Sequence, residues 1–216
     1  MTSLRLRYQT LEFGETDIHV RTLRDRQQFS DADKIAENLG IYSSTWSLFG
    51  VIWDSSKILA HLMFDYEVKG KRILEVGCGI ALSSLVLNSR SADITATDYH
   101  PEVESFLDKN VELNGGNTIP FSINDWADNN SSLGKFDLII GSDLLYEPNH
   151  AELLSHFIHQ HAKPHCEVII VDPGRSQHTQ FSKNMVLLGY SHSKTKPGNT
   201  SYLHSPFKGH ILNYRR

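Results

Sequence analysis

The feature that most constrains the fold is a short apolar run that ends in two glycines and leads into a second apolar segment, ILEVGCGIAL, at residues 73–82. The segment RILEV (72–76) predicts a buried strand, because it is short, apolar and rich in branched side chains. Gly77 and Gly79 permit a sharp turn of the backbone. The following ALSSLVLN predicts a helix, whose first N–H groups would face the turn. The stretch therefore predicts a strand–turn–helix unit with room for a ligand at the turn.

Strands and helices continue to alternate along the rest of the chain. We predict further strands at 93–98, 119–125, 136–143, 166–172 and 210–216, and helices at 53–64, 101–115, 150–162 and 176–189. Such alternation is typical of an α/β protein with a doubly wound, mostly parallel sheet that helices cover on both faces. The polar stretch 191–209 is expected to be a loop.

The N-terminal segment follows a different pattern. Residues 5–23 alternate apolar and polar side chains on either side of Gly14, which predicts a β-hairpin. SDADKIAENLG then predicts a short helix, capped by Ser30 or Asp31 and ended by Gly40. We expect a single domain over residues 1–216, in which this hairpin and helix (1–45) extend a core at 46–216.

Composition excludes several classes of function. The net charge of −4 gives no support for non-specific binding to nucleic acid. No apolar run approaches the roughly 18 residues that cross a bilayer, and the start of the chain has no apolar signal segment. We therefore expect a cytoplasmic protein with no membrane contact and with reduced thiols at Cys78 and Cys166. The histidines of HFIHQHAKPH (156–165) lack the spacing of a metal site, so we expect a solvated helix face and no metal.

Charged residues near the glycine turn define the kind of ligand. Asp98 ends the second predicted strand of the sheet, where an acid accepts both hydroxyls of a ribose. Glu75 would repel a pyrophosphate but suits a ligand with a positive ammonium or sulfonium group. Leu82 stands where a dinucleotide fingerprint has its third glycine. These residues predict a nucleoside ligand such as S-adenosylmethionine.

Aromatic side chains are expected to complete that ligand site. Asp125 and Trp126 follow the third strand, where the carboxylate would bind an adenine amino group and the indole would stack on the ring. Trp53 begins the helix 53–64, and its indole would cover a sulfonium or the adenine. The structural alternatives are an ordinary loop aromatic for Trp126 and a packing contact of the helix for Trp53.

The fourth strand ends in GSDLLYEPNH (141–150) rather than in a simple turn. Asp143 is placed to bind and orient an amine at the mouth of the site. The hydroxyl of Tyr146 is placed to hydrogen-bond the same nucleophile. The structural alternative is that Asp143 caps the next segment while Tyr146 packs beneath it.

Together these motifs resemble the seven-stranded (class I) S-adenosylmethionine-dependent methyltransferases, and among them the lysine-methyltransferase-like branch. The resemblance covers about residues 45–190, and VDPGR (171–175) is similar to the end of the fifth strand in bacterial members. It implies a Rossmann-like seven-stranded sheet, S-adenosylmethionine as cofactor and methyl transfer to a nitrogen, with a protein lysine as the expected acceptor. The implied catalytic residues are Asp143 and Tyr146. The implied cofactor-binding residues are Trp53, Glu75, Gly77, Cys78, Gly79, Asp98, Tyr99, Asp125, Trp126 and Ser142.

Other functions stay open at this point. A small-molecule N-methyltransferase on the same fold would be favoured by a narrow acceptor pocket, closed by the N-terminal hairpin and the 191–209 loop. An open groove would favour a protein acceptor. Leu82 and Glu75 argue against a dinucleotide-dependent oxidoreductase, and the complete set of cofactor residues argues against a non-catalytic binding module. We expect a monomer or a weak dimer.

Overall fold

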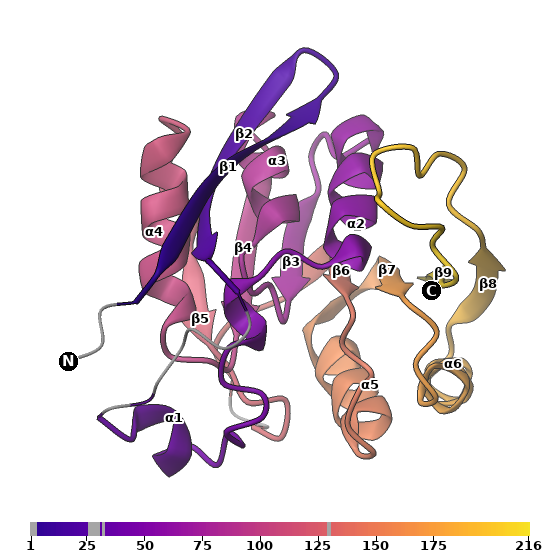
Figure 1. The fold of residues 1–216 in the computed structure, drawn as a ribbon. Coiled ribbons are helices and arrows are strands. Elements are labelled where there is room, and N and C mark those ends of the chain that lie inside the picture. The colour runs from indigo at the N-terminus through magenta and orange to yellow at the C-terminus, as the bar shows by residue number, and fades with distance from the viewer. Residues whose placement is uncertain (1–3, 26–30, 32, 129–130) are drawn as a thin grey trace.

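The structure, a computed structural model, describes residues 4–25, 31, 33–128 and 131–216. Its centre is a seven-stranded sheet with the order β5-β4-β3-β6-β7-β9-β8 (Figure 1). The parallel strands are β3 (Arg72–Val76), β4 (Asp93–Asp98), β5 (Phe121–Ile123), β6 (Phe136–Ser142) and β7 (Ala162–Asp172). The antiparallel neighbours are β9 (His210–Arg215), which pairs with β7, and β8 (Ser191–Thr195), which pairs with β9. The predicted mostly parallel, seven-stranded sheet is confirmed.

Helices cover both faces of this sheet (Figure 1). One face carries α2 (Asp54–Asp65), α3 (Leu82–Ser89) and α4 (Val103–Leu113), and the other carries α5 (His150–His161) and α6 (His178–Leu187). Successive side chains of a strand point to opposite faces. Ile73 accordingly packs in the hydrophobic cluster with Leu59, whereas Leu74 packs in the opposite cluster with Phe157. The central strands read as continuous apolar runs because both faces are buried.

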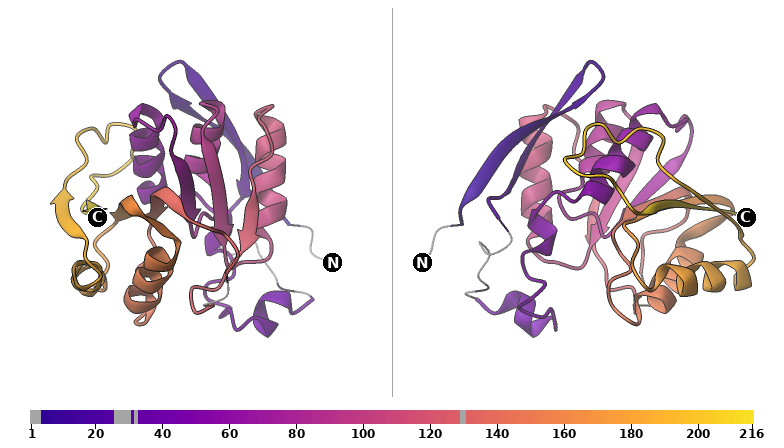
Figure 2. Two further views of the ribbon diagram at one scale, coloured as in Figure 1. Left: turned by 180° about the vertical axis from the view of Figure 1, so that it is seen from behind. Right: turned by 45° about the vertical axis from the view of Figure 1, so that its right-hand side comes forward.

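The predicted 191–209 loop is partly wrong. Its first residues form β8, and every residue of this strand is exposed. An edge strand without a buried face carries no hydrophobic alternation, so the polar sequence concealed it. The remainder returns across α2, where the ring of Tyr202 stacks on His61 at a centroid distance of 3.6 Å. Figure 2 shows this segment beside α2, at the end of the sheet that carries β8.

The N-terminal hairpin is confirmed as β1 (Leu6–Phe13) and β2 (Thr16–Leu23), with Gly14 at φ 58° in the turn. It packs against α4 rather than joining the central sheet (Figures 1 and 2). The N–H of Arg21 donates to Asn110 Oδ1 at 2.7 Å, and the Asn110 amide donates in return to the Arg21 carbonyl. A buried asparagine of α4 therefore acts as an added partner along the edge of β2.

The short helix that follows the hairpin is α1 (Ile35–Asn38), four residues long. The N-cap position is held by Lys34 rather than by Asp31, but the carboxylate of Asp31 accepts the N–H groups of Ile35 at 2.9 Å and Glu37 at 2.7 Å and so stabilises the first turn. Ser30, the other predicted cap, lies outside the described residues. A 3₁₀ turn, η1 (Leu48–Gly50), connects this region to α2.

One histidine of the predicted solvated face is not solvated. His161 is 2% exposed, and its Nδ1 lies 2.9 Å from the carbonyl oxygen of Gly134, whereas His156, His159 and His165 are exposed. Within the described ranges, no three possible ligands gather as a metal site would require. No helix in those same ranges is both long and apolar enough to pass through a bilayer.

Candidate functional site

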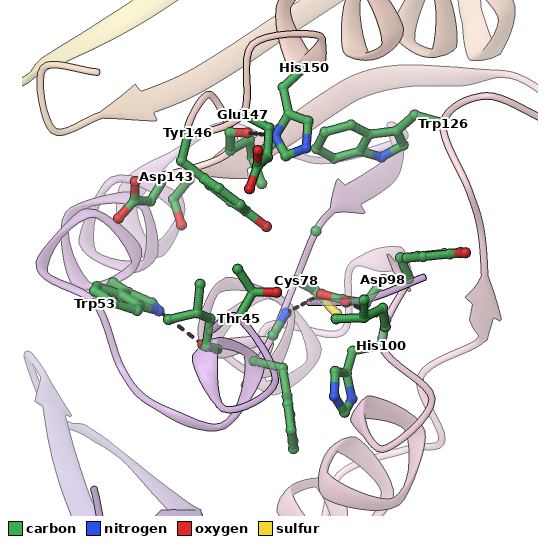
Figure 3. A pocket seen from close by; sticks show the side chains of 18 of the residues that line it. Thr45, Trp53, Cys78, Asp98, His100, Trp126, Asp143, Tyr146, Glu147 and His150 are labelled. Carbon is green, nitrogen blue, oxygen red and sulfur yellow. Dashed lines mark hydrogen bonds between the residues drawn. The ribbon is translucent and has the colours of Figure 1, made fainter. Parts of the chain in front are cut away.

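A cavity of about 710 Å³ opens at the carboxyl ends of β3, β4, β5 and β6. Residues from the connection before α2 and from the start of α5 complete its walls (Figure 3). Its volume lies in the range of sites that bind small molecules and cofactors. The cavity brings together all but one of the predicted site residues: Trp53, Gly77, Cys78, Gly79, Asp98, Tyr99, Asp125, Trp126, Ser142, Asp143 and Tyr146.

The two glycines of the turn, on either side of Cys78, contribute no side chains to the floor of the cavity. Gly77 and Gly79 have φ angles of 58° and 53°, in the left-handed region that favours glycine. A Cβ on Gly77 would lie 2.5 Å from Leu144 Cδ2, and one on Gly79 would lie 3.0 Å from the carbonyl oxygen of Phe49. Between them the Cys78 N–H donates to the Thr97 carbonyl at 3.0 Å. Burial raises the pKa of the Cys78 thiol well above its usual range, so the thiol stays protonated.

The exception among the predicted residues is Glu75, which does not line the cavity. It is 2% exposed and turns toward α3, where its Oε2 accepts the N–H of Ser84 at 2.8 Å and the Ser84 hydroxyl at 2.5 Å. Burial raises the pKa of Glu75 to about 7. The expected contact with a positively charged ligand is therefore replaced by a contact that joins β3 to the first turns of α3.

Asp98 binds the glycine turn directly. Its Oδ2 accepts the N–H of Gly79 at 2.8 Å, and its Oδ1 accepts the N–H of His100 at 2.9 Å. Burial raises the pKa of Asp98. The neighbouring His100 stacks on Phe49 with ring centroids 4.0 Å apart, and burial lowers the pKa of its imidazole to about 4. The carboxylate is thus fixed beside the turn and available on the cavity side.

A second wall comes from the end of β5 and its neighbours. Asp125 is exposed, and its Oδ1 accepts the N–H of Ala127 at 2.9 Å. Trp126 meets the ring of His150 edge-on, with centroids 5.2 Å apart. At the end of the neighbouring strand β4, the hydroxyl of Tyr99 donates to the Leu39 carbonyl at 2.6 Å, which ties the segment after α1 to the site. Asn124, which the sequence analysis missed, is buried and also lines the cavity.

Asp143 already has a charged partner. Its Oδ1 accepts from Arg175 Nε at 2.7 Å and its Oδ2 accepts from Arg175 Nη2 at 3.1 Å, a bidentate ion pair. The backbone of Asp143 is left-handed at φ 55°, and its N–H donates to the Val171 carbonyl at 2.9 Å. The structural alternative of Asp143 as a simple cap is therefore not what the structure shows. Arg175 was missed as a site residue, although it ends the VDPGR motif.

Tyr146 and His150 lie on the same side of the cavity as Asp143, opposite Asp98 (Figure 3), and form its rim there. Tyr146 is 45% exposed, and its ring meets His150 edge-on at 4.7 Å. Its hydroxyl points into the cavity (Figure 3), where desolvation, together with the nearby carboxylates of Asp98 and Glu147, raises its pKa to about 12. His150 Nδ1 lies 2.7 Å from the Leu144 carbonyl, so this nitrogen carries the proton. His150 had no motif that would have marked it.

The connection before α2 supplies the remaining wall. Thr45, Leu48 and Phe49 line the cavity, and the Trp53 indole N–H donates to the Leu48 carbonyl at 3.1 Å. The N-terminal hairpin and the described residues of the 191–209 stretch contribute nothing to the lining. A narrow acceptor pocket closed by these two segments would favour a small-molecule acceptor. Among the described residues, neither segment closes the cavity in this way.

The mostly parallel sheet and the cavity at its strand ends define a Rossmann-like fold. Among solved structures, the chain is similar to a ribosomal protein L11 methylase from Lactobacillus delbrueckii subsp. bulgaricus, with a TM-score of 0.59, 21% identity, and coverage of 77% of this chain and 80% of that one. At this identity the likeness concerns the fold alone.

The sequence comparison identifies the family. Residues 36–187 match the family described as lysine methyltransferase, and the chain belongs to this family. It is 30% identical over 141 residues to the mouse electron transfer flavoprotein beta subunit lysine methyltransferase, covering 63% of this chain and 53% of the relative. It is 33% identical over 115 residues to the protein N-lysine methyltransferase METTL21A of Danio rerio, covering 48% and 52%. The chain thus spans about half the length of these relatives.

Proposed function

We propose that this protein is an S-adenosylmethionine-dependent N-methyltransferase that acts on a lysine side chain of another protein. The observation that carries the proposal is that one cavity joins the bare glycine turn, the Asp98 carboxylate and the Asp143–Tyr146 pair. When bound, S-adenosylmethionine supplies a methyl group on a positively charged sulfur. An uncharged amine takes this methyl group, and the sulfur leaves as the neutral thioether of S-adenosylhomocysteine.

The residues of the cavity fit this cofactor. Asp98 would accept the ribose hydroxyls, and Gly77 and Gly79, which have no Cβ, would let the ligand approach the backbone closely. Asp125, Asn124 and Trp126 would hold the adenine by hydrogen bonds and ring contact. These assignments use side chains at the ends of β4 and β5 and the backbone at the end of β3, where ligands of doubly wound sheets bind.

The charge of the cavity also fits a cationic ligand. Its lining contains the carboxylates of Asp98, Asp125, Asp143 and Glu147, against the single guanidinium of Arg175 among the described residues. A sulfonium and an incoming lysine both carry positive charge, and carboxylates attract them. The pyrophosphate of a dinucleotide would be repelled, which argues against the oxidoreductase alternative.

The chain's own residues prepare the acceptor. A lysine with a pKa near 10.4 is mostly an ammonium ion at neutral pH and must lose a proton before it attacks. Tyr146 keeps its own proton, since its pKa is raised to about 12, so its oxygen can orient an N–H group without acting as a base. Asp143 offers the second acceptor at the same rim. Positioning of the amine would supply most of the catalysis.

The exposed rim supports a protein acceptor over a small molecule. Tyr146 is 45% exposed, so a side chain that projects from a protein surface can reach the rim. The names of the two relatives, both of which methylate lysine in proteins, support the same acceptor.

The test is incubation of the purified protein with methyl-labelled S-adenosylmethionine and lysate from its own cell. We expect a labelled protein band, and mass spectrometry should place the methyl group on a lysine. The Asp98→Ala variant should give no band. Label in the small-molecule fraction alone, or on a residue other than lysine, would contradict the proposed acceptor.

A further inference from the structure

The ion pair between Asp143 and Arg175 differs from the rest of the described cavity lining in the positive charge that it contains and in its bidentate hydrogen bond. Arg175 provides the one permanently cationic side chain in the described lining, and both oxygens of Asp143 are bound by its fork. The side chain of Asp143 is 9% exposed and that of Arg175 is 40% exposed. The pair therefore stands at the boundary between the buried strand ends and the open rim.

The backbone around Arg175 is fixed on both sides. Asp172 Oδ1 accepts the N–H groups of Gly174 at 2.8 Å and Arg175 at 2.9 Å. The carbonyl of Arg175 lies 2.6 Å from Nδ1 of His178, at the start of α6. These contacts hold the guanidinium at the end of β7, next to the end of β6 that carries Asp143.

The pairing changes what Asp143 can offer to an amine. A carboxylate has about four lone-pair positions, and the bidentate fork occupies two of them in fixed directions. The remaining positions still accept an N–H hydrogen bond, from a direction that Arg175 determines. The net charge of the pair is zero, so it attracts an ammonium ion far less than an isolated carboxylate would. A neutral amine, the form that attacks a methyl group, keeps its hydrogen bond.

We propose that Arg175 is a positioning residue for methyl transfer: it orients the Asp143 carboxylate and offsets its charge, so that the pair holds the acceptor lysine as the neutral amine. This inference rests on the proposed function, because it takes lysine as the acceptor. It assigns to the final residue of VDPGR a role in substrate recognition through Asp143 rather than through contact with the cofactor.

Several other ionisable groups face this pair and must be considered in any measurement against pH. Tyr146 and Glu147 come from the β6–α5 connection and His150 from the start of α5. Asp172 comes from the end of β7, His178 from α6 and Asp98 from the end of β4. The variants below leave all six groups in place. Loss of Arg175 would raise the pKa of Tyr146 further, so this hydroxyl stays protonated in every variant.

The experiment measures kcat against pH for the wild type and three variants, with the acceptor protein identified by the labelling experiment above. In Arg175→Met the unpaired carboxylate should stabilise the ammonium form, and the apparent pKa of the rising limb should increase by roughly 1 unit. The rate at pH 7 would fall about 10-fold and would recover at higher pH. Arg175→Lys keeps the positive charge but loses the bidentate hydrogen bond. Its kcat should therefore fall, while the apparent pKa of its rate profile stays that of the wild type.

The double variant distinguishes a charge effect from a general loss of structure. Asp143→Asn combined with Arg175→Met removes both charges, so its profile should return to that of the wild type although its rate stays low. Arg215→Met serves as the matched control, because Arg215 is an exposed arginine that pairs with Glu167, which like Arg215 does not line the cavity. Profiles for Arg175→Met and the wild type that superimpose would overturn the charge role.

Failure of the proposed function is distinguishable from failure of this inference. If the wild type labels no lysine, the proposed function is wrong, and the orienting role of Arg175 is then tested by the crystal structure of Arg175→Met. A carboxylate of Asp143 that turns away from its present direction supports that role. One that keeps its direction without the guanidinium overturns it. Calorimetry with S-adenosylhomocysteine should give equal affinities for the wild type and Arg175→Met.

Discussion

The carboxylate of Glu75 and the first turn of α3 are joined through Ser84, which donates both its backbone N–H and its hydroxyl to one carboxylate oxygen. Both residues are buried, so this contact connects β3 to α3 inside the protein. A carboxylate near the first turn of a helix also interacts favourably with the free N–H groups there. Glu75 is thus placed to hold the two elements on either side of the glycine turn.

The raised pKa of Glu75 predicts a dependence of stability on pH. Because the folded state binds this proton more tightly, the stabilisation is present below pH 4.5 and is lost as pH rises through about 7. A shift of this size corresponds to about 3 kcal/mol in the free energy of unfolding. The glutamine side chain in Glu75→Gln cannot ionise. Between pH 5 and 8 the free energy of unfolding of this variant, measured in urea, should therefore fall less than that of the wild type. The exposed Glu104→Gln on α4 is the control and should follow the wild type. If the free energy of unfolding changed equally with pH in the wild type and in Glu75→Gln, Glu75 would not ionise in this range.

Replacement of Asp98 tests the proposed ribose contact. Asp98→Ala removes the acceptor for the Gly79 and His100 N–H groups, and with it the carboxylate that we propose binds the ribose. We expect the affinity for S-adenosylmethionine, measured by calorimetry, to fall at least 100-fold, since hydrogen bonds to a charged group contribute about 1.5–3 kcal/mol each. Asp93→Ala, at the exposed start of the same strand, is the matched control and should bind normally. If the affinity of Asp98→Ala for S-adenosylmethionine were unchanged, Asp98 would not bind the ribose.

Much of this site could be predicted because its residues follow strands at fixed positions. Gly77, Asp98, Asp125 and Asp143 each come within two residues of a strand end, and parallel strands place their carboxyl ends along one edge. Glu75 was misplaced for a related reason. It lies inside β3, where alternation decides the face to which a side chain points, and that face leads to α3 rather than to the cavity.

The parts that the sequence did not predict depend on contacts between distant segments. Arg175 meets Asp143 across 32 positions, and no local pattern announces such a pair. His150 belongs to the rim only because α5 begins there, and Thr45 belongs to it because the connection before α2 turns back over the strand ends. The exposed strand β8 was missed because an edge strand needs no apolar side chains.

The floor of the cavity predicts a specific effect of adding one methyl group. In Gly77→Ala the new Cβ would lie 2.5 Å from Leu144, which is buried and has little room to move. The substitution should lower the melting temperature and weaken cofactor binding at least 10-fold, because both the left-handed backbone and the crowding are unfavourable. Gly70→Ala is the control: its φ of 72° imposes the backbone strain, but its Cβ would contact nothing within 4 Å. Equal falls in melting temperature and equal cofactor affinities for Gly77→Ala and Gly70→Ala would show that crowding by Leu144 has no effect.

Tyr146 provides the final prediction, because its position and its acidity lead to separate results. Its hydroxyl points into the cavity and its pKa is raised to about 12, so it stays protonated at every pH at which the protein would be assayed. Tyr146→Phe removes the hydrogen bond that we propose to the acceptor, and kcat should fall roughly 10-fold, as the loss of about 1.4 kcal/mol implies. The affinity for S-adenosylmethionine should stay within a few-fold, and the shape of the rate profile between pH 6 and 10 should not change. Tyr8→Phe, on the exposed hairpin strand β1, is the matched control for the loss of a tyrosine hydroxyl. A limb of the profile that disappears in Tyr146→Phe would instead identify this tyrosine as the base that accepts the proton of the amine.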